Sequence, residues 1–246
     1  MSRVLLVCGS LFLAGSMMEG GSPGARVPVL LELFTSEGCS SCPPADRFLE
    51  KLDREQPVAG ADLIVLSEHV DYWNQLGWAD PFSSQLYSQR QREYASHQGG
   101  EVYTPELVID GQKGLVGSDE REVMQAVRGA ARGQKAMLQV GAEKVDRQLK
   151  VTVRLSEPAD GVLYVALAHD AMKSNVLRGE NAGRGLSHVA VVYAIQKVGK
   201  VDRQSDTTHE ARISLPPGIS SEKTRVVAFV EKTAGGRVVA VGQTRL

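Results

Sequence analysis

The chain has few cysteines and almost no net charge, and each shortage excludes a class of protein. Three cysteines in 246 residues are too few for the disulfide framework of a small secreted scaffold. A formal net charge of −1 offers no basic field to nucleic acid, which we therefore do not expect as a partner. A phosphate-binding loop, a nucleophile elbow and a dinucleotide fingerprint are also missing, and we expect no cofactor. These shortages leave a globular protein of one to two domains.

Residues 1–22 have the pattern of an export leader. A basic start precedes an apolar run of 15 residues, Val4–Met18, and Ala14–Ser16 supplies small residues at the spacing that a signal peptidase needs. The run is short for a membrane anchor, which is the alternative and needs about 20 residues. We therefore expect cleavage, no stable membrane insertion and a periplasmic or extracellular location. Cys8 would leave with the leader, so the mature chain keeps two cysteines.

The near-neutral total charge hides two segments of opposite sign that meet near residue 135. Residues 26–134 carry 10 Lys and Arg against 17 Asp and Glu, a net charge of −7, whereas residues 135–246 carry 17 against 11, a net of +6. Two domains whose facing surfaces attract would explain this division, and chance would explain it equally well.

Residues 27–134 alternate strand and helix signals. Near-continuous apolar runs predict buried strands, and Gly111 separates two of them as a hairpin. Apolar residues at helical spacing follow Cys42, and an Asp-x-x-Glu capping box at Asp119 begins a later helix. An aromatic-rich insert is expected at residues 69–100. The predicted strands are Val29–Thr35, Leu63–Ser67, Leu107–Asp110 and Gly114–Gly117.

Residues 135–246 consist mainly of β-branched runs separated by turns. Several runs alternate apolar and polar residues, which is typical of half-buried strands, and about seven such strands predict an antiparallel β-sandwich. The predicted strands are Ala136–Val145, Gln148–Leu155, Val162–His169, Val189–Val198, Glu210–Leu215, Arg225–Glu231 and Arg237–Gln243.

The two cysteines of the mature chain, Cys39 and Cys42, stand where the first predicted strand meets a helix. Free amides and the dipole at a helix N-terminus favour thiolate and lower a cysteine pKa from about 8.5 to about 3.5–7.5. Cys39 is therefore the expected nucleophile, and Cys42 is expected to resolve a mixed disulfide. Glu37 opposes thiolate formation if its carboxylate points toward Cys39. Thr104 and Pro105 precede a later strand, where a cis bond would turn the chain beside the thiols.

These features together resemble the thioredoxin fold over residues 27–134. The resemblance implies that Pro105 is the cis-proline of that fold, packed against the cysteine pair and lining a substrate groove. The expected fold class is thus an α/β thioredoxin-like domain followed by an all-β sandwich domain. Active thioredoxins have a Trp before the first cysteine and Gly-Pro between the two, where Gly38 and Ser40–Ser41 stand here. The position of their buried acid falls on Leu33. The adjacent Glu32 should face the other way; it is either buried near the site or a strand-end carboxylate paired with an Arg, and the second interpretation is favoured.

Three longer strings resemble a narrower family. They are Leu31–Asp46, His69–Trp73 and Arg178–Arg184, and they are similar to the exported bacterial family catalogued as domain of unknown function 1223. The similarity spans nearly all of the mature chain, and it implies no established reaction.

Two further segments are candidates for the substrate groove. His69, Asp71 and Trp73 stand at the end of a predicted strand, where open α/β folds place ligands. The polar segment 178–188 is either a solvated loop or a cover over the thiols that supplies Arg donors to a carboxylate or to Glu37. Its candidate residues are Arg178, Glu180, Asn181, Arg184 and His188.

Six of the 13 aromatic residues lie between Tyr72 and Tyr94. They form either an apolar wall of the groove or the core of the insert, and the second interpretation is favoured because aromatic side chains more often pack than bind.

The motifs predict an exported thiol-disulfide oxidoreductase that acts through Cys39 and Cys42 on a protein or a small thiol or disulfide substrate. The alternative is a binding or structural module in which Cys39–Cys42 is a permanent disulfide. A third interpretation is a zinc or copper site in which His69, His97 or His188 completes the ligands supplied by the two cysteines. No second Cys-x-x-Cys and no paired histidine spacing in the sequence supports it. Substrate, redox partner and oligomeric state are not encoded in any motif.

Overall fold

The computed structural model describes residues 26–202, 204, 208–216, 219 and 221–246, so the predicted export leader lies outside the described residues. No helix among them is long and apolar enough to cross a membrane. The helices are α1 (Cys42–Glu55), α2 (Gln85–Gln98), α3 (Glu120–Ala130) and a short 3-10 helix at Ser221–Lys223. The strands are β1 (Val27–Thr35), β2 (Ala61–His69), β3 (Glu106–Ile109), β4 (Lys113–Val116), β5 (Ala136–Val145), β6 (Gln148–Leu155), β7 (Gly161–Asn175), β8 (Gly185–Val201), β9 (Thr208–Ser214), β10 (Thr224–Glu231) and β11 (Val238–Arg245).

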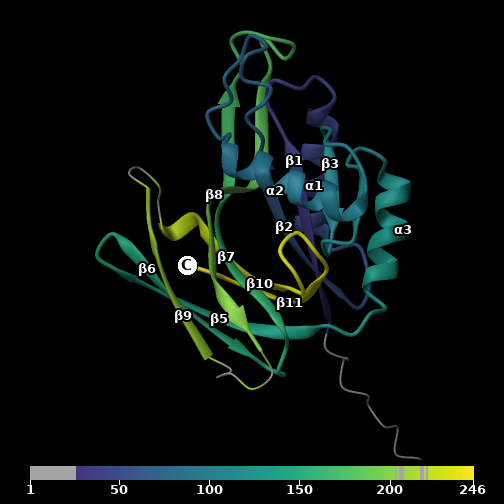
Figure 1. Cartoon of the computed structure of the whole chain (residues 1–246). Helices are drawn as coiled ribbons and strands as arrows, with labels where there is room; N and C mark the ends of the chain where they lie inside the picture. The colour runs from purple at the N-terminus through teal and green to yellow at the C-terminus, as the bar shows by residue number, and fades with distance from the viewer. Residues whose placement is uncertain (1–25, 203, 205–207, 217–218, 220) are drawn as a thin grey trace, which may run out of the picture.

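All eleven strands belong to one mixed sheet, and this corrects the expected fold class. Their order is β4-β3-β1-β2-β8-β7-β10-β11-β5-β6-β9 (Figure 1). The prediction of a thioredoxin-like domain followed by a β-sandwich is therefore wrong, because β1 to β4 form one end of a sheet that the later strands continue. The predicted strands lie close to the observed ones, so the error concerns their assembly rather than their existence.

Strand β8 joins the two parts of the sheet. It pairs antiparallel with β7 over nearly its whole length and parallel with β2 at Ser67 and Val191. Alternation of apolar residues shows which face of a strand is buried, but it does not show which strand lies beside it. In Figure 1 the long β7–β8 hairpin runs beside β2 and ends in a loop at the top of the view.

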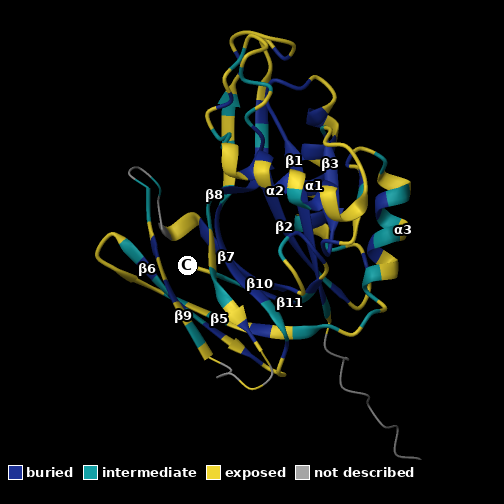
Figure 2. Ribbon diagram, viewed as in Figure 1, coloured by how far each residue is buried: buried dark blue, intermediate teal, exposed yellow. Residues whose placement is uncertain are grey.

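Helices cover both faces of the sheet at β1 and β2, whose residues are almost all buried (Figure 2). Leu49 and Leu52 of α1 belong to the same apolar cluster as Leu31 and Leu33 of β1. On the opposite face, Tyr94 of α2 donates a hydrogen bond to the carboxylate of Glu32. A second apolar cluster, contributed mainly by β5, β6, β7, β9 and β10, fills the interior of the C-terminal part.

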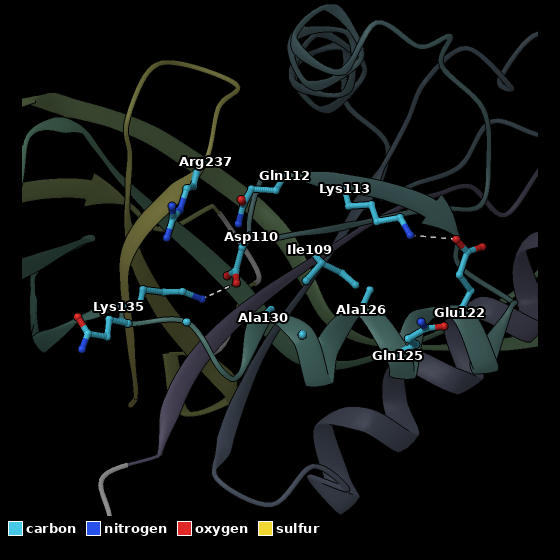
Figure 3. A pocket seen from close by; sticks show the side chains of 13 residues that line it. Ile109, Asp110, Gln112, Lys113, Glu122, Gln125, Ala126, Ala130, Lys135 and Arg237 are labelled. Carbon is cyan, nitrogen blue, oxygen red and sulfur yellow. Dashed lines mark hydrogen bonds and ion pairs between the residues drawn. The ribbon is translucent and has the colours of Figure 1, made fainter.

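Ion pairs link basic residues of segment 135–246 to acidic residues of segment 26–134. Arg225 of β10 binds both carboxylate oxygens of Asp53 on α1, at 2.7 and 2.9 Å. Lys135 reaches Asp110 at the edge of a pocket of about 660 Å³ beside the C-terminal end of α3 (Figure 3). Both side chains of this second pair are almost fully buried. The opposite charges of the two segments therefore meet inside the molecule.

A further buried cluster surrounds Arg90 of α2. The Arg90 guanidinium donates to Glu32 Oε1 at 2.6 and 2.8 Å and to Glu231 Oε1 at 2.7 Å. Glu68 lies 3.6 Å from the same guanidinium, and burial raises its pKa well above the usual value. Glu32, Glu68 and Glu231 come from β1, β2 and β10, so one cation holds three strands to the helix. Glu32 thus pairs with an Arg, as the favoured interpretation expects, but it is fully buried in the middle of β1 rather than at a strand end.

Replacing Arg90 with Met should lower the free energy of unfolding by about 3–5 kcal/mol, because the variant leaves buried carboxylates without their counter-charge. Urea denaturation followed by circular dichroism measures the change. Arg92→Met is the matched control, since Arg92 is exposed on the same helix, and its effect should stay within about 0.5 kcal/mol. Equal losses in the two variants would contradict a structural role for the cluster.

Candidate functional site

The cysteine pair lies in the turn between β1 and α1, and it is oxidised. Cys39 and Cys42 form a disulfide with their Cα atoms 5.4 Å apart. Helix α1 begins at Cys42 with proline in its first turn, where no backbone donor is lost. Both cysteines have exposed fractions of 0%, whereas Ser40 and Ser41 between them are exposed. The predicted location of the pair is therefore observed, but its sulfur atoms are covered.

The predicted Thr104 and Pro105 lie beside this turn. The Thr104–Pro105 peptide bond is cis, and it directly precedes β3, whose Glu106 is paired with Phe34 near the end of β1. The indole of Trp73 donates to Thr104 Oγ1 at 2.8 Å.

Trp73 and Asp71 leave β2 in different directions. A Cβ atom added to Gly38 would lie only 3.1 Å from the Cβ atom of Trp73. Trp73 therefore packs directly against the cysteine turn. Asp71 instead accepts a hydrogen bond from Ser88 Oγ at 2.5 Å and so faces α2. The structure thus brings Trp73 to the site and leaves Asp71 beside it.

Glu37, two residues before the disulfide, is a buried carboxylate with three side-chain donors. Trp78 Nε1 lies 2.8 Å from Glu37 Oε2, His188 Nε2 lies 3.2 Å from Oε1, and Ser174 also donates to Oε1. Burial raises the pKa of Glu37, but these hydrogen bonds outweigh burial and hold it below its usual value. The carboxylate is therefore ionised beside the cysteine turn at neutral pH.

Two buried histidines complete a charged cluster next to Glu37. His69 Nδ1 lies 2.7 Å from Asp80 Oδ2, and the same oxygen accepts the Glu37 amide at 2.8 Å. His188 Nδ1 lies 3.7 Å from Asp46 Oδ1 on α1, and the two imidazole rings meet edge to face at 4.7 Å. We call Glu37, Asp46, His69, Asp80 and His188 the charged cluster.

The carboxylates on either side of His188 keep its ring protonated. Burial lowers the pKa of His188, but Asp46 and Glu37 outweigh burial and raise it to about 10. Burial likewise opposes the charged form of Asp80, and His69 with two backbone amides holds the Asp80 pKa below its usual value. The His188 side chain is therefore a buried imidazolium that lies between the carboxylates of Glu37 and Asp46.

The polar segment 178–188 folds over the cysteine turn. Asn181 is fully buried, and its amide donates to the carbonyls of Glu37 at 2.8 Å and Cys39 at 2.9 Å. Glu180 accepts the backbone amide of Ser40 at 3.0 Å. Arg184 donates to Asn181 Oδ1 at 2.9 Å rather than to a carboxylate.

Arg178 is exposed, and the donors to Glu37 are not the arginines that the sequence suggested. Sequence reasoning missed Ser174, which nothing in its neighbourhood distinguishes, and Asp80, whose role depends on a turn. Asp46 could have been identified from the sequence. It lies four residues after Cys42, so the two residues share a face of α1.

The aromatic residues between 72 and 94 have divided roles. Tyr87 and Tyr94 are buried core residues, whereas Trp73 and Trp78 contact the site. No three His, Cys, Asp or Glu side chains of the described residues are placed to hold a metal ion. His97, one of the suggested ligands, is exposed near the end of α2.

Replacing His188 with Gln should destabilise the protein most between about pH 4.5 and 6.5. The folded-state pKa of His188 lies above its ordinary value of 6.5, so its stabilisation is complete below pH 6.5 and is lost as pH rises toward 10. Glu37 has a lowered pKa, so its share is present above 4.5 and is lost in acid. Unfolding free energies of both proteins from about pH 3 to about pH 10 test this prediction, because the difference should fall away on both sides of the window. His97→Gln should give a flat difference, and a flat difference for His188→Gln as well would refute the charged pair.

Comparisons with known proteins agree with the longer sequence strings. Residues 30–231 match the family model described as "Protein of unknown function (DUF1223)". A crystal structure of a protein from Agrobacterium tumefaciens has 26% identity and a TM-score of 0.66, covering 89% of this chain and 95% of that chain. A domain of the outer membrane lipoprotein Omp28 from Porphyromonas gingivalis has 21% identity and a TM-score of 0.30, covering 46% of this chain and 88% of that one. The search of curated proteins gave no match. The matched residues cover most of the chain, which therefore belongs to the DUF1223 family.

Proposed function

We propose that this protein is a thiol-disulfide redox protein whose reactive pair is Cys39 and Cys42. The observation that carries the proposal is the charged cluster, which packs a buried imidazolium and buried carboxylates against the cysteine turn. Perturbed titratable groups gather at functional sites, and a bridge that only staples the chain needs none of them. The proposal includes export to the periplasm or the cell exterior, where disulfides persist.

The exchange reaction balances with the two cysteines and one substrate disulfide. The Cys39 thiolate attacks a substrate sulfur, forms a mixed disulfide and releases the other substrate sulfur as a thiolate, which takes up a proton. Cys42 then loses its proton and attacks Cys39 Sγ, which closes the bridge and releases the second substrate thiol. Two electrons pass to the substrate, and the reverse sequence oxidises a dithiol.

Access to the bridge requires residues 176–184 to move. This stretch includes the first part of the polar segment 178–188. Neither cysteine has exposed surface, and Asn181 binds the main-chain carbonyls on both sides of Gly38. The amide of Val176 donates to the carbonyl of Arg184 at 3.0 Å. This hydrogen bond joins the two ends of the stretch. A thiolate reaches Cys39 only after Asn181 has left its place.

The zero exposure of the two cysteines also favours a second candidate, a permanent disulfide in a module without turnover. The two functions differ in the reduction potential of the bridge and in the reactivity of reduced Cys39. A redox centre should have a potential above about −300 mV and a Cys39 pKa below about 8.5. Equilibration with glutathione and thioredoxin buffers, together with the pH dependence of iodoacetamide alkylation, measures both quantities. A potential below about −300 mV with an ordinary thiol pKa would establish the permanent bridge instead.

Replacing Asn181 with Ala should speed reduction of the bridge by dithiothreitol about tenfold or more. Loss of its two buried hydrogen bonds weakens the closed position of the segment by an amount that shifts such an equilibrium at least tenfold. The rate is followed by the appearance of free thiol at neutral pH. Asn175→Ala is the control, since Asn175 is exposed on the same hairpin, and its rate should equal that of the wild type. An unchanged rate in Asn181→Ala would show that this segment does not limit access.

A further inference from the structure

A second hollow lies behind the charged cluster and takes no part in the proposed exchange. It has a volume of about 720 Å³ and is bounded by β8, by the segment that leads into α2 and by the end of β9. Its volume falls within the range of about 300–1,000 Å³ that small-molecule sites occupy. Among its lining residues are Phe82, Leu86, Tyr87, Met172, Ala194 and Ile213.

Phe82 separates this pocket from the two histidines. Its ring meets His69 edge to face at 5.4 Å and His188 at 5.9 Å. The same side chain lines the pocket, so a molecule in the pocket touches the outer wall of the charged cluster. The pocket is a separate site, because none of the residues of the cluster lines it.

The chemistry of the walls identifies the kind of ligand. No Lys, Arg, Asp or Glu is present among the described residues that line the pocket. His169 also lines it, and its Nδ1 accepts the backbone amide of Ala171 at 3.3 Å. An ion placed there would lose its water without gaining a counter-charge, which is costly. A ligand that fits these walls carries no net charge.

Several polar groups of the lining are already bound within the protein. Tyr87 donates to the carbonyl of Val192 at 2.9 Å, and Ser83 donates to the carbonyl of Asp80 at 2.8 Å. The hydroxyl groups of Tyr193 and Thr224 lie 3.0 Å apart. Because these polar groups are already bound, apolar contact is the main means of recognition in the pocket. Leu86, with an exposed fraction of 46%, forms part of its rim.

We propose that this pocket is a binding site for an uncharged, mainly apolar small molecule. Aromatic and aliphatic walls suit a ring system or an acyl group, and without lysine or arginine the pocket offers phosphate and carboxylate ligands no strong counter-charge. The site goes beyond the redox function and does not depend on it, because its walls and its ligand chemistry are independent of the disulfide.

Fluorescence titration with the uncharged probe N-phenyl-1-naphthylamine tests the site on the oxidised full chain. We expect saturable binding of one probe per chain. Ala194→Phe fills the pocket and should weaken binding about tenfold or more. Ala171→Phe makes the same change on the paired strand β7 at an exposed residue outside the pocket, and it should leave the affinity unchanged.

A second pair of variants keeps the test valid if Ala194→Phe fails to fold. Leu86→Glu places a charge at the exposed rim and should weaken binding, whereas Leu76→Glu, at an exposed leucine outside the pocket, should not. Anilinonaphthalene sulfonate, a charged analogue, should bind about tenfold more weakly than the uncharged probe.

Three outcomes of the binding measurements, and a fourth that depends on protein concentration, would overturn the proposal. The three are binding without saturation, equal losses in pocket and control variants, and equal affinity for the charged and uncharged probes. An affinity that falls as the protein concentration rises would identify a second copy of the chain as the occupant and would likewise overturn it.

Discussion

The ion cluster around Arg90 is the constraint on which the rest of the molecule depends. A guanidinium with an exposed side-chain fraction of 5% is surrounded by the fully buried carboxyl groups of Glu32, Glu68 and Glu231, which come from β1, β2 and β10. Such a group is tolerated in an interior only if its charges are paired and its donors are used. Since Glu231 is far from Glu32 in the sequence, the pairing is complete only when the C-terminal strands have been added to the same sheet. The cluster thus ties the formation of α2 to the assembly of the whole sheet.

The continuous sheet explains why the candidate site contains residues from both ends of the chain. Glu37 and Cys39 follow β1, whereas Ser174 and His188 come from the β7–β8 hairpin, which reaches the cysteine turn because β8 lies next to β2. A separate C-terminal domain would have had to dock its loop onto the thiols through a mobile interface. Here the hairpin belongs to the same sheet as β1, so His188 is positioned by strand pairing.

The sequence predicts individual elements well and their assembly poorly. The runs at 136–145 and 148–155 coincide with β5 and β6, because alternation and turn residues are local signals. The pairing of Ser67 with Val191 is not local, and no periodicity encodes it, which is why a sandwich was predicted where the sheet continues. The site follows the same division. The cysteine turn and the polar segment 178–188 stand out as unusual strings, whereas Asp80 acquires its role only when a turn brings it to His69.

The charges around the cysteine turn bear on which redox state the fold favours. Glu37 lies two residues before Cys39, and Asp46 lies four residues after Cys42 on α1, with the His188 imidazolium between the two carboxylates. A thiolate at Cys39 would add a further negative charge to this part of the structure. The disulfide carries no charge and so avoids this repulsion. Asn181 donates to main-chain carbonyls of the cysteine turn and not to sulfur, and under the proposed function these bonds hold its segment over the bridge. The carboxylates of Glu37 and Asp46 favour the oxidised pair, so the Cys39 pKa below about 8.5 that the proposed function requires depends on the N-terminus of α1 outweighing them. A partner that reduces the pair must supply binding energy to displace Asn181 before it supplies electrons.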